Sequence, residues 1–226
     1  MFDPYELIAA LAAVRRDRQR AYADAPGRIR TCDLALRRRA LYPLSYGRLR
    51  RRGSLAPLRG GRHGPVQLAI ISDTHMPRGA RDLPAACVER LRAADAILHA
   101  GDFSELEVLE RLQALGPLVH AVQGNVDSLE LRMTLPRVAL IDADGATIVM
   151  THDGGPAAGR LARLRARFPD ADAVVFGHSH LPLHEAADGF HLFNPGSPTE
   201  RRRAPEHTMG LAGAEGGRLR FQHVTL

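Results

Sequence analysis

The chain has 226 residues, of which 45% are hydrophobic and 25% are charged. These values are those of an ordinary globular protein and exclude a collagen, a coiled coil or a chain that is disordered throughout. No run of about 18 apolar residues is present, and the short apolar stretch at residues 7–14 has acids before it and arginines after it, so neither a membrane span nor a signal peptide is expected. Two cysteines, Cys32 and Cys87, cannot build a disulfide framework or a zinc ribbon, so we expect a cytoplasmic protein.

The positive charge is concentrated at one end of the chain. Residues 1–65 hold 15 arginines and five acids, a net charge of +10, whereas residues 66–226 stand at −4. Such an excess normally indicates a nucleic-acid partner, but here it is confined to one segment, so nucleic acid is disfavoured as a partner. The stretch at residues 48–64 is rich in arginine, glycine and proline, a composition typical of disorder. The sequence therefore predicts an extension over residues 1–65 and one domain over residues 66–226.

From residue 66 onward, short apolar runs alternate with helical patterns. The first half predicts strands at 67–72, 96–100 and 118–123, with helices at 83–94 and from Ser104, which with Glu107 has the spacing of a capping box. The second half predicts a helix at 161–168, a strand at 173–176 and three pairs of strands: 137–141 with 146–151, 183–186 with 190–193, and 210–214 with 218–225. The alternation in the first half indicates parallel strands, and the second half is mostly hairpins.

Polar side chains collect where five of these strands end. In chain order they are Asp73, His75, Asp102, Asn125, His152, His178 and His180. Because ligand sites in open α/β sheets lie at the carboxyl ends of strands, we expect these side chains to meet. Imidazole nitrogens together with carboxylate oxygens suit manganese, iron or zinc. Glycines precede Asp102, Asn125 and His178 and are expected to let the backbone turn sharply there.

The motifs follow one another in a recognisable order. They are D-x-H at 73–75, G-D at 101–102, G-N-x-D at 124–127, a lone His at 152, G-H-x-H at 177–180 and N-P-G-S at 194–197. This set resembles the calcineurin-like metallophosphoesterase family, and most closely its small single-domain bacterial and archaeal phosphodiesterases. The resemblance covers about residues 67–226 and implies an α/β fold, a four-layer α/β/β/α sandwich with a dinuclear metal centre.

The resemblance also implies a role for each polar residue. Metal one would take Asp73, His75, Asp102 and His180. Metal two would take Asp102, Asn125, His152 and His178, with Asp102 as the bridge. It implies a phosphodiesterase that uses a metal-bridging hydroxide, with Asp102, Asn125 and His152 as the catalytic residues and a small-molecule or nucleotide phosphodiester as substrate. Two divalent ions are expected, manganese first, with nickel, iron, zinc or magnesium as alternatives. The other function is a non-catalytic scaffold of the same fold, and the oligomeric state, including a homo-oligomer, is left open.

Two positions depart from the family pattern. Val126 stands where many phosphomonoesterases of this type carry a histidine that protonates the leaving group. Asp153 stands where the family commonly has glycine, and it either orients His152 or is a loop acid. Asp127 is expected as a hydrogen-bond acceptor or in a turn.

Other polar residues receive structural interpretations. Asn194 and Ser197 are expected to shape a loop, and Arg201, Arg202 and Arg203 to form a solvated run that could also hold phosphate. Cys87 is expected in the core. The remaining histidines of the domain are interpreted as ordinary residues: His99, His120, His184, His191, His207 and His223.

The arginine-rich extension carries its own resemblance. Residues 27–48 resemble spurious translations across transfer-RNA genes, because Arg28 to Thr31 and Leu44 to Tyr46 can be back-translated into the complements of the T-arm and the D-arm. The hypothesis is that residues 1–65 come from an over-extended reading frame that truly starts near Val66. A basic RNA-binding arm and a genuine disordered extension remain as alternatives.

Overall fold

The computed structural model describes residue 58, residues 64–79 and residues 81–226. Predictions for residues 7–14, residues 27–48 and Cys32 therefore lie outside the described residues. Among the described residues, no helix is both long and apolar enough to cross a membrane.

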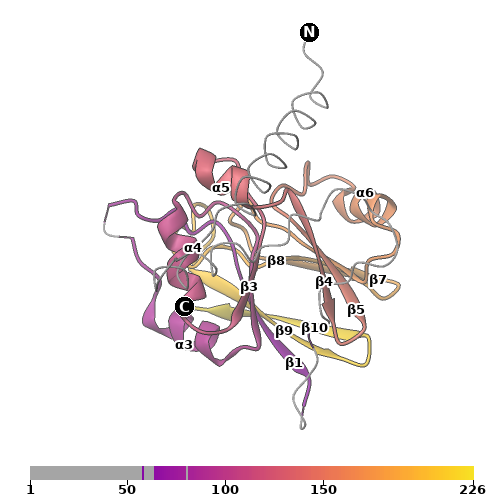
Figure 1. Cartoon of the computed structure of the whole chain (residues 1–226). Coiled ribbons are helices and arrows are strands. Elements are labelled where there is room, and N and C mark those ends of the chain that lie inside the picture. Colours follow the sequence, from indigo (N-terminus) through magenta and orange to yellow (C-terminus); the bar gives the residue numbers. More distant parts are fainter. Residues whose placement is uncertain (1–57, 59–63, 80) are drawn as a thin grey trace, which may run out of the picture. The chain divides into compact units, whose positions relative to one another are not determined.

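Two five-stranded sheets form the centre of the domain (Figure 1). The first sheet has the strand order β10-β9-β1-β2-β3. Its parallel strands are β1 (Val66–Ile71), β2 (Ala96–His99) and β3 (Leu118–Ala121), and its antiparallel strands are β9 (Thr208–Glu215) and β10 (Arg218–Thr225). The parallel part is the one predicted from alternating strands and helices.

The second sheet has the strand order β4-β5-β6-β8-β7. Its strands are β4 (Val138–Ala143), β5 (Ala146–Thr151), β6 (Ala173–Val175), β7 (Leu183–Ala187) and β8 (Phe190–Asn194). The pairs β4–β5 and β7–β8 are antiparallel hairpins, whereas β5, β6 and β8 run parallel to one another. All three predicted hairpins are confirmed.

Three hydrophobic clusters hold the layers together. The largest lies between the sheets and joins residues such as Ile70, Leu98, Ile148 and Phe193. A second cluster packs α3 (Ala85–Ala93), α4 (Leu106–Gln113) and α5 (Leu129–Thr134) on the outer face of the first sheet, and a third packs α6 (Arg160–Arg167) on the second. Figure 1 shows α3 and α4 on one side of the strands and α6 on the other. The predicted four-layer α/β/β/α sandwich is confirmed, and buried Cys87 belongs to its core.

The predicted capping box at Ser104 is wrong. α4 begins at Leu106, its N-cap is Glu105, and no side chain caps it. Ser104 is instead in the left-handed region with φ 89°, and its N–H donates to Asp127 Oδ1 at 3.0 Å. A contact from a distant loop thus outweighs the local signal. α5, capped by Ser128, was not predicted.

Leu58, which precedes the predicted domain boundary at residue 66, contacts the domain. Its N–H donates to the Asp142 carbonyl at 3.0 Å, and its carbonyl accepts from the Asp144 N–H at 2.8 Å. Its half-buried side chain packs against the inter-sheet cluster. At least this residue of the extension is therefore part of the folded unit.

Candidate metal centre

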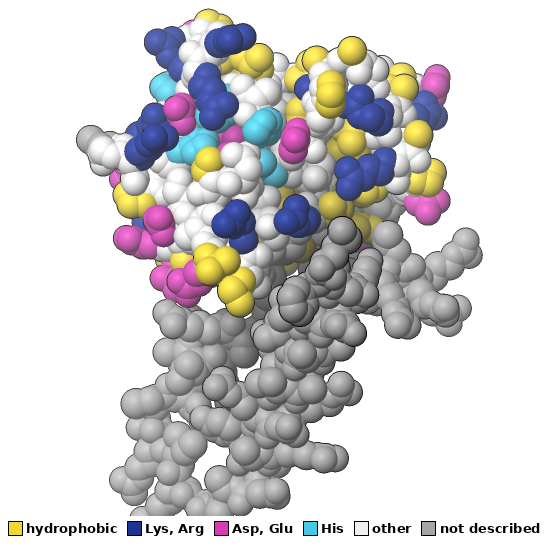
Figure 2. Space-filling model, turned by 90° about the horizontal axis from the view of Figure 1, so that it is seen from above, with side chains coloured by type: hydrophobic (Ala, Val, Ile, Leu, Met, Phe, Trp, Pro, Cys, Tyr) yellow, Lys and Arg dark blue, Asp and Glu magenta, His cyan; other side chains and the backbone are white. Residues whose placement is uncertain are grey.

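The seven predicted site residues all lie in loops at the carboxyl ends of β1, β2, β3, β5 and β6. Two groups of potential metal ligands form there, and in each group the ligand atoms lie within 4.8 Å of one another. The first group is Asp73, His75 and His180, and the second is Asp102, His152 and His178. Figure 2 shows histidine side chains gathered on this face of the domain.

The first group is compact and buried. The Nε2 atoms of His75 and His180 are 3.2 Å apart, and Asp73 Oδ1 is 3.3 Å from the latter and 3.9 Å from the former. Asp73 accepts from two donors, namely the Ser72 hydroxyl at 2.7 Å and the His178 N–H, which reaches both carboxylate oxygens. Three ligand atoms therefore converge on one point.

Asp102 lies between the two groups. Its Oδ2 atom is 3.7 Å from His75 Nε2 in the first group and 3.2 Å from His152 Nε2 in the second. Its other oxygen, Oδ1, accepts from the Val126 N–H at 2.9 Å. One carboxylate thus reaches both groups, as a bridging ligand must.

Asn125 joins the second group through its amide oxygen. Its Oδ1 lies 3.0 Å from His152 Nε2 and 2.8 Å from His178 Nδ1. The structure therefore brings together all seven residues that the sequence predicted.

Hydrogen bonds fix which nitrogen of two histidines faces the site. His152 Nδ1 donates to the Ala100 carbonyl at 2.7 Å, and His180 Nδ1 donates to the Glu200 carbonyl at 2.5 Å. Both rings therefore turn Nε2 toward their group. Metal-bound histidines are oriented in this way, with the second nitrogen donating to a carbonyl.

The electrostatics of the first group fit a cation. Burial raises the pKa of Asp73 to about 7, and burial lowers the pKa of His180 to about 4. Burial thus disfavours the negative charge on Asp73 and the positive charge on His180. A divalent ion bound there would compensate the charge of the Asp73 carboxylate. The donor set of carboxylate oxygens, imidazole nitrogens and one amide oxygen matches such an ion chemically.

Asp102 behaves differently because His152 and a backbone N–H already stabilise its ionised form. Burial alone would raise its pKa, but the hydrogen bond and charge of His152, with the Val126 N–H, outweigh burial and bring the pKa of Asp102 down to about 2. The central carboxylate is therefore ionised across the whole neutral range, as a bridge between two cations requires.

Five of these residues have a left-handed backbone. The φ angles are 57° at Asp73, 45° at His75, 61° at Asp102, 68° at His178 and 59° at His180. Residues other than glycine rarely adopt such angles and do so at a cost of roughly 1–3 kcal/mol each, mostly at functional sites. Interactions elsewhere in the fold offset this cost, and the strained backbone directs the side chains toward the site.

The glycines before Asp102, Asn125 and His178 are each required by the structure. For two of them the reason differs from the sharp turn that the sequence predicted. Only Gly101 has a positive φ, of 92°. A Cβ at Gly124 would collide with Asp102 Oδ1, and a Cβ at Gly177 would collide with the Ser72 hydroxyl and lie 2.7 Å from Asp73 Oδ2. At these two positions, close approach of the backbone to a site carboxylate, rather than a sharp turn, requires glycine.

Side chains behind the site tie its loops together. Buried Asp127 accepts from the Ser104 N–H and from the Gly124 N–H at 2.6 Å, which confirms it as an acceptor. Ser197 donates from its hydroxyl to the Asp73 carbonyl, and Asn194 donates to the Gly177 carbonyl, both at 2.8 Å. Asn194 and Ser197 shape loops as predicted.

Contacts decide between the two interpretations of Asp153 and show where the arginine run lies. Asp153 is exposed and accepts from the Gly155 N–H at 2.7 Å, so it is a loop acid, and the Ala100 carbonyl orients His152 in its place. Arg201, Arg202 and Arg203 are exposed, but Arg202 donates to the His178 carbonyl at 3.4 Å and thus borders the site.

Sequence reasoning missed two residues. His99, interpreted as ordinary, is fully buried, stacks on Phe103 with ring centroids 3.5 Å apart, and accepts from the Gly101 N–H. Its position two residues before Gly101 was the only available signal. Glu200, which no motif contains, places Oε2 3.8 Å from His75 Nε2 and pairs with Arg81 at 3.0 Å.

Comparison with known proteins agrees with this geometry. A family model described as the calcineurin-like phosphoesterase superfamily domain matches residues 66–217. A probable metallophosphoesterase of Methanothermobacter thermautotrophicus is 34% identical over 146 residues, which are 64% of this chain and 84% of that protein. A phosphodiesterase of Methanocaldococcus jannaschii is 22% identical over 144 residues, which are 58% of this chain and 83% of that protein.

A solved structure shares the fold. Vacuolar protein sorting 29 of Cryptosporidium parvum superposes with a TM-score of 0.61 at 21% identity, covering 73% of this chain and 99% of that one. Because the family model matches residues 66–217, which are more than half of the chain, the chain belongs to the calcineurin-like phosphoesterase superfamily.

Proposed function

We propose that this protein is a phosphodiesterase that depends on two divalent metal ions. The observation that carries the proposal is the position of Asp102, whose Oδ2 reaches ligand atoms of both groups, at 3.7 and 3.2 Å. Asp73, His75 and His180 would hold one ion, Asn125, His152 and His178 the other, and Asp102 both. Manganese is the ion we expect, because the donors are a mixture of oxygen and nitrogen without thiolate.

The chemistry divides between the ions and the chain. When bound, two such ions lower the pKa of a water between them and neutralise the phosphate oxygens. The chain itself orients His152 through the Ala100 carbonyl and holds Asp102 ionised. Asn125 and His152 line the pocket beside the second group and would contact the phosphate there.

The position after Asn125 argues for diesters with good leaving groups. Val126 is 45% exposed and carries no proton to donate. Without a general acid at that position, a leaving group of high pKa departs slowly, since such help is worth about 10²–10⁴ in rate.

The experiment combines metal content with hydrolysis. The purified protein is expected to hold two manganese ions and to hydrolyse bis(p-nitrophenyl) phosphate, and to lose both properties after EDTA treatment and regain them with Mn²⁺. Hydrolysis that survives complete removal of metal would contradict the proposal. A protein that binds metal and hydrolyses no diester would instead be a scaffold, the function that its structural likeness to vacuolar protein sorting 29 leaves open.

A further inference from the structure

A pocket of about 430 Å³ adjoins the second group of candidate ligands. Asn125, His152 and His178 line one part of it, and three arginines line another: Arg132, Arg137 and Arg167. Nothing in the sequence motifs marks these arginines, which come from α5, from the residue before β4 and from the last residue of α6. Three separate elements thus bring guanidinium groups to one pocket.

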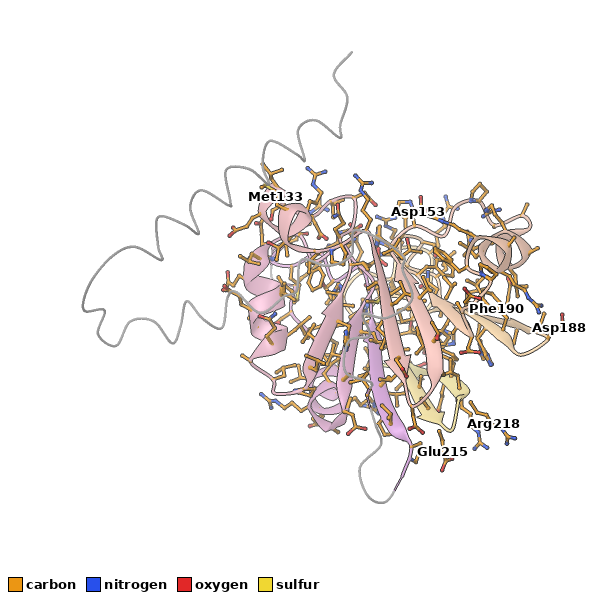
Figure 3. All side chains as sticks on the ribbon, turned by 45° about the vertical axis from the view of Figure 1, so that its right-hand side comes forward. Met133, Asp153, Asp188, Phe190, Glu215 and Arg218 are labelled. Atoms are coloured by element: carbon orange, nitrogen blue, oxygen red, sulfur yellow. The ribbon has the colours of Figure 1, made fainter. Side chains whose placement is uncertain are left out.

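The arginines lie on the same rim as the candidate metal centre. Figure 3 labels Met133, next to Arg132 in the chain, and Asp153, next to His152, and both lie along the upper edge of the domain. Figure 2, viewed from above that edge, shows arginine side chains around the histidines. The pocket, together with exposed Asn125 and His178 of the second group, is therefore open to solvent on this face.

The charge of these arginines is not balanced within the described part of the chain. No ion pair joins Arg132, Arg137 or Arg167 to a described carboxylate, although other surface arginines have partners, for example Arg165 with Asp188 at 2.9 Å. The cation of Arg167 lies over the Phe168 ring at 5.0 Å from its centroid. Asp153 is the acid that lines the pocket, so its side chains beyond the candidate ligands carry a net positive charge.

We propose that this pocket binds a second phosphate of the substrate, so that the preferred substrate is a small phosphodiester that carries a further, non-bridging phosphate group. The proposal rests on the phosphodiesterase function above. Planar guanidinium groups bind phosphate oxygens in pairs of parallel hydrogen bonds, and the pocket volume is that of a site for a small molecule. The diester would lie at the candidate metal centre, with its additional phosphate among the three arginines.

Two nucleotides that share the scissile bond and the leaving group test this preference. They are thymidine 5′-(p-nitrophenyl phosphate) and the same compound with a 3′-phosphate. We expect the manganese-loaded protein to show a kcat/KM about tenfold or more higher for the 3′-phosphorylated compound, mostly through KM. Arg137→Gln and Arg167→Gln should each reduce this ratio several-fold. Arg165→Gln should keep it, because Arg165 of α6 does not line the pocket and pairs with Asp188 in the turn between β7 and β8.

A binding measurement separates this proposal from the phosphodiesterase function. By calorimetry on the EDTA-treated protein, thymidine 3′,5′-bisphosphate should bind more tightly than thymidine 5′-monophosphate, and Arg137→Gln should remove the difference. Hydrolysis of both nucleotides at equal kcat/KM would overturn the second-phosphate site and leave the phosphodiesterase function standing. Absence of any hydrolysis, with the difference in binding present and sensitive to Arg137→Gln, would overturn the phosphodiesterase function and leave the phosphate pocket standing.

Discussion

The backbone N–H of His178 donates to both carboxylate oxygens of Asp73, at 3.1 and 2.9 Å, across 105 positions of sequence. Asp73 follows β1 of the first sheet, and His178 follows β6 of the second. Each sheet therefore positions a candidate ligand that the other sheet carries, and the candidate metal centre lies across the contact between the two sheets.

Replacement of the central carboxylate tests the assignment of two metal sites. Asp102→Asn removes the charge that reaches both groups, so we expect loss of metal from both sites and a fall in kcat/KM of at least about 10³. Metal analysis after gel filtration measures the first effect. Asp153→Asn, which changes an exposed acid next to His152, serves as the control and should keep both ions. Two bound ions and normal turnover in Asp102→Asn would contradict a bridging role.

A methyl group added at Gly177 should displace the Asp73 carboxylate from its position in the candidate site. Its Cβ would collide with the Ser72 hydroxyl and crowd Asp73 Oδ2, so we expect Gly177→Ala to lose about 2 kcal/mol of unfolding free energy and most of its metal affinity. Gly213→Ala is the matched control, because the nearest atom to its Cβ, Gln67 Nε2, would be at an ordinary 3.8 Å. Urea unfolding and metal titration of both variants make the comparison; equal behaviour of the two would contradict the close-approach explanation.

His120 is a place where the protein can be stabilised. Its Nε2 atom is buried and has no hydrogen-bond partner in the described part of the chain, and burial lowers its pKa. As the pH falls through 6.5, His120 becomes protonated in the unfolded chain but stays neutral in the folded chain. Its ionisation therefore lowers the free energy of unfolding in acid. We expect His120→Phe to raise the free energy of unfolding by about 1 kcal/mol at pH 7.5, and by more at pH 5.5. A variant that is less stable than the wild type at both pH values would show that the ring makes a favourable interaction.

The dependence of rate on the leaving group tests the role of Val126. We expect a steep fall in kcat from aryl to alkyl diesters in the wild type, and a rise of about tenfold or more for alkyl diesters in Val126→His. A flat dependence in the wild type would mean that another acid protonates the leaving group.

Truncation tests the proposed domain boundary. We expect a chain that begins at Val66 to fold and hydrolyse diesters, since all seven candidate ligands lie beyond that point. Its unfolding free energy should be about 1–2 kcal/mol below that of a chain that begins at Pro57, because the latter keeps the two Leu58 hydrogen bonds and the half-buried Leu58 side chain. Thermal unfolding of the two chains measures the difference, and equal midpoints would assign no stabilising role to Leu58.

The sequence predicted the strands and the seven candidate ligands because each core strand is a short apolar run that ends directly in a polar motif. It did not predict α5, whose six residues expose Leu129 and Met133 and so lack an amphipathic pattern. Ser104 is not a helix cap because its N–H donates to Asp127, 23 positions away. A local sequence pattern cannot predict such a distant contact. The same holds for the three pocket arginines, which only the folded chain brings together.

The left-handed backbone at five candidate ligands has a consequence for the history of this family. Glycine at any of these positions would relieve the strain and at the same time remove a ligand, so selection for stability and selection for chemistry act there in opposite directions. A lineage that abandons the reaction is therefore expected to drift toward glycine or asparagine at positions 73, 75, 102, 178 and 180 while its core stays intact. A comparison of relatives at those five positions would therefore test whether they keep the proposed metal site.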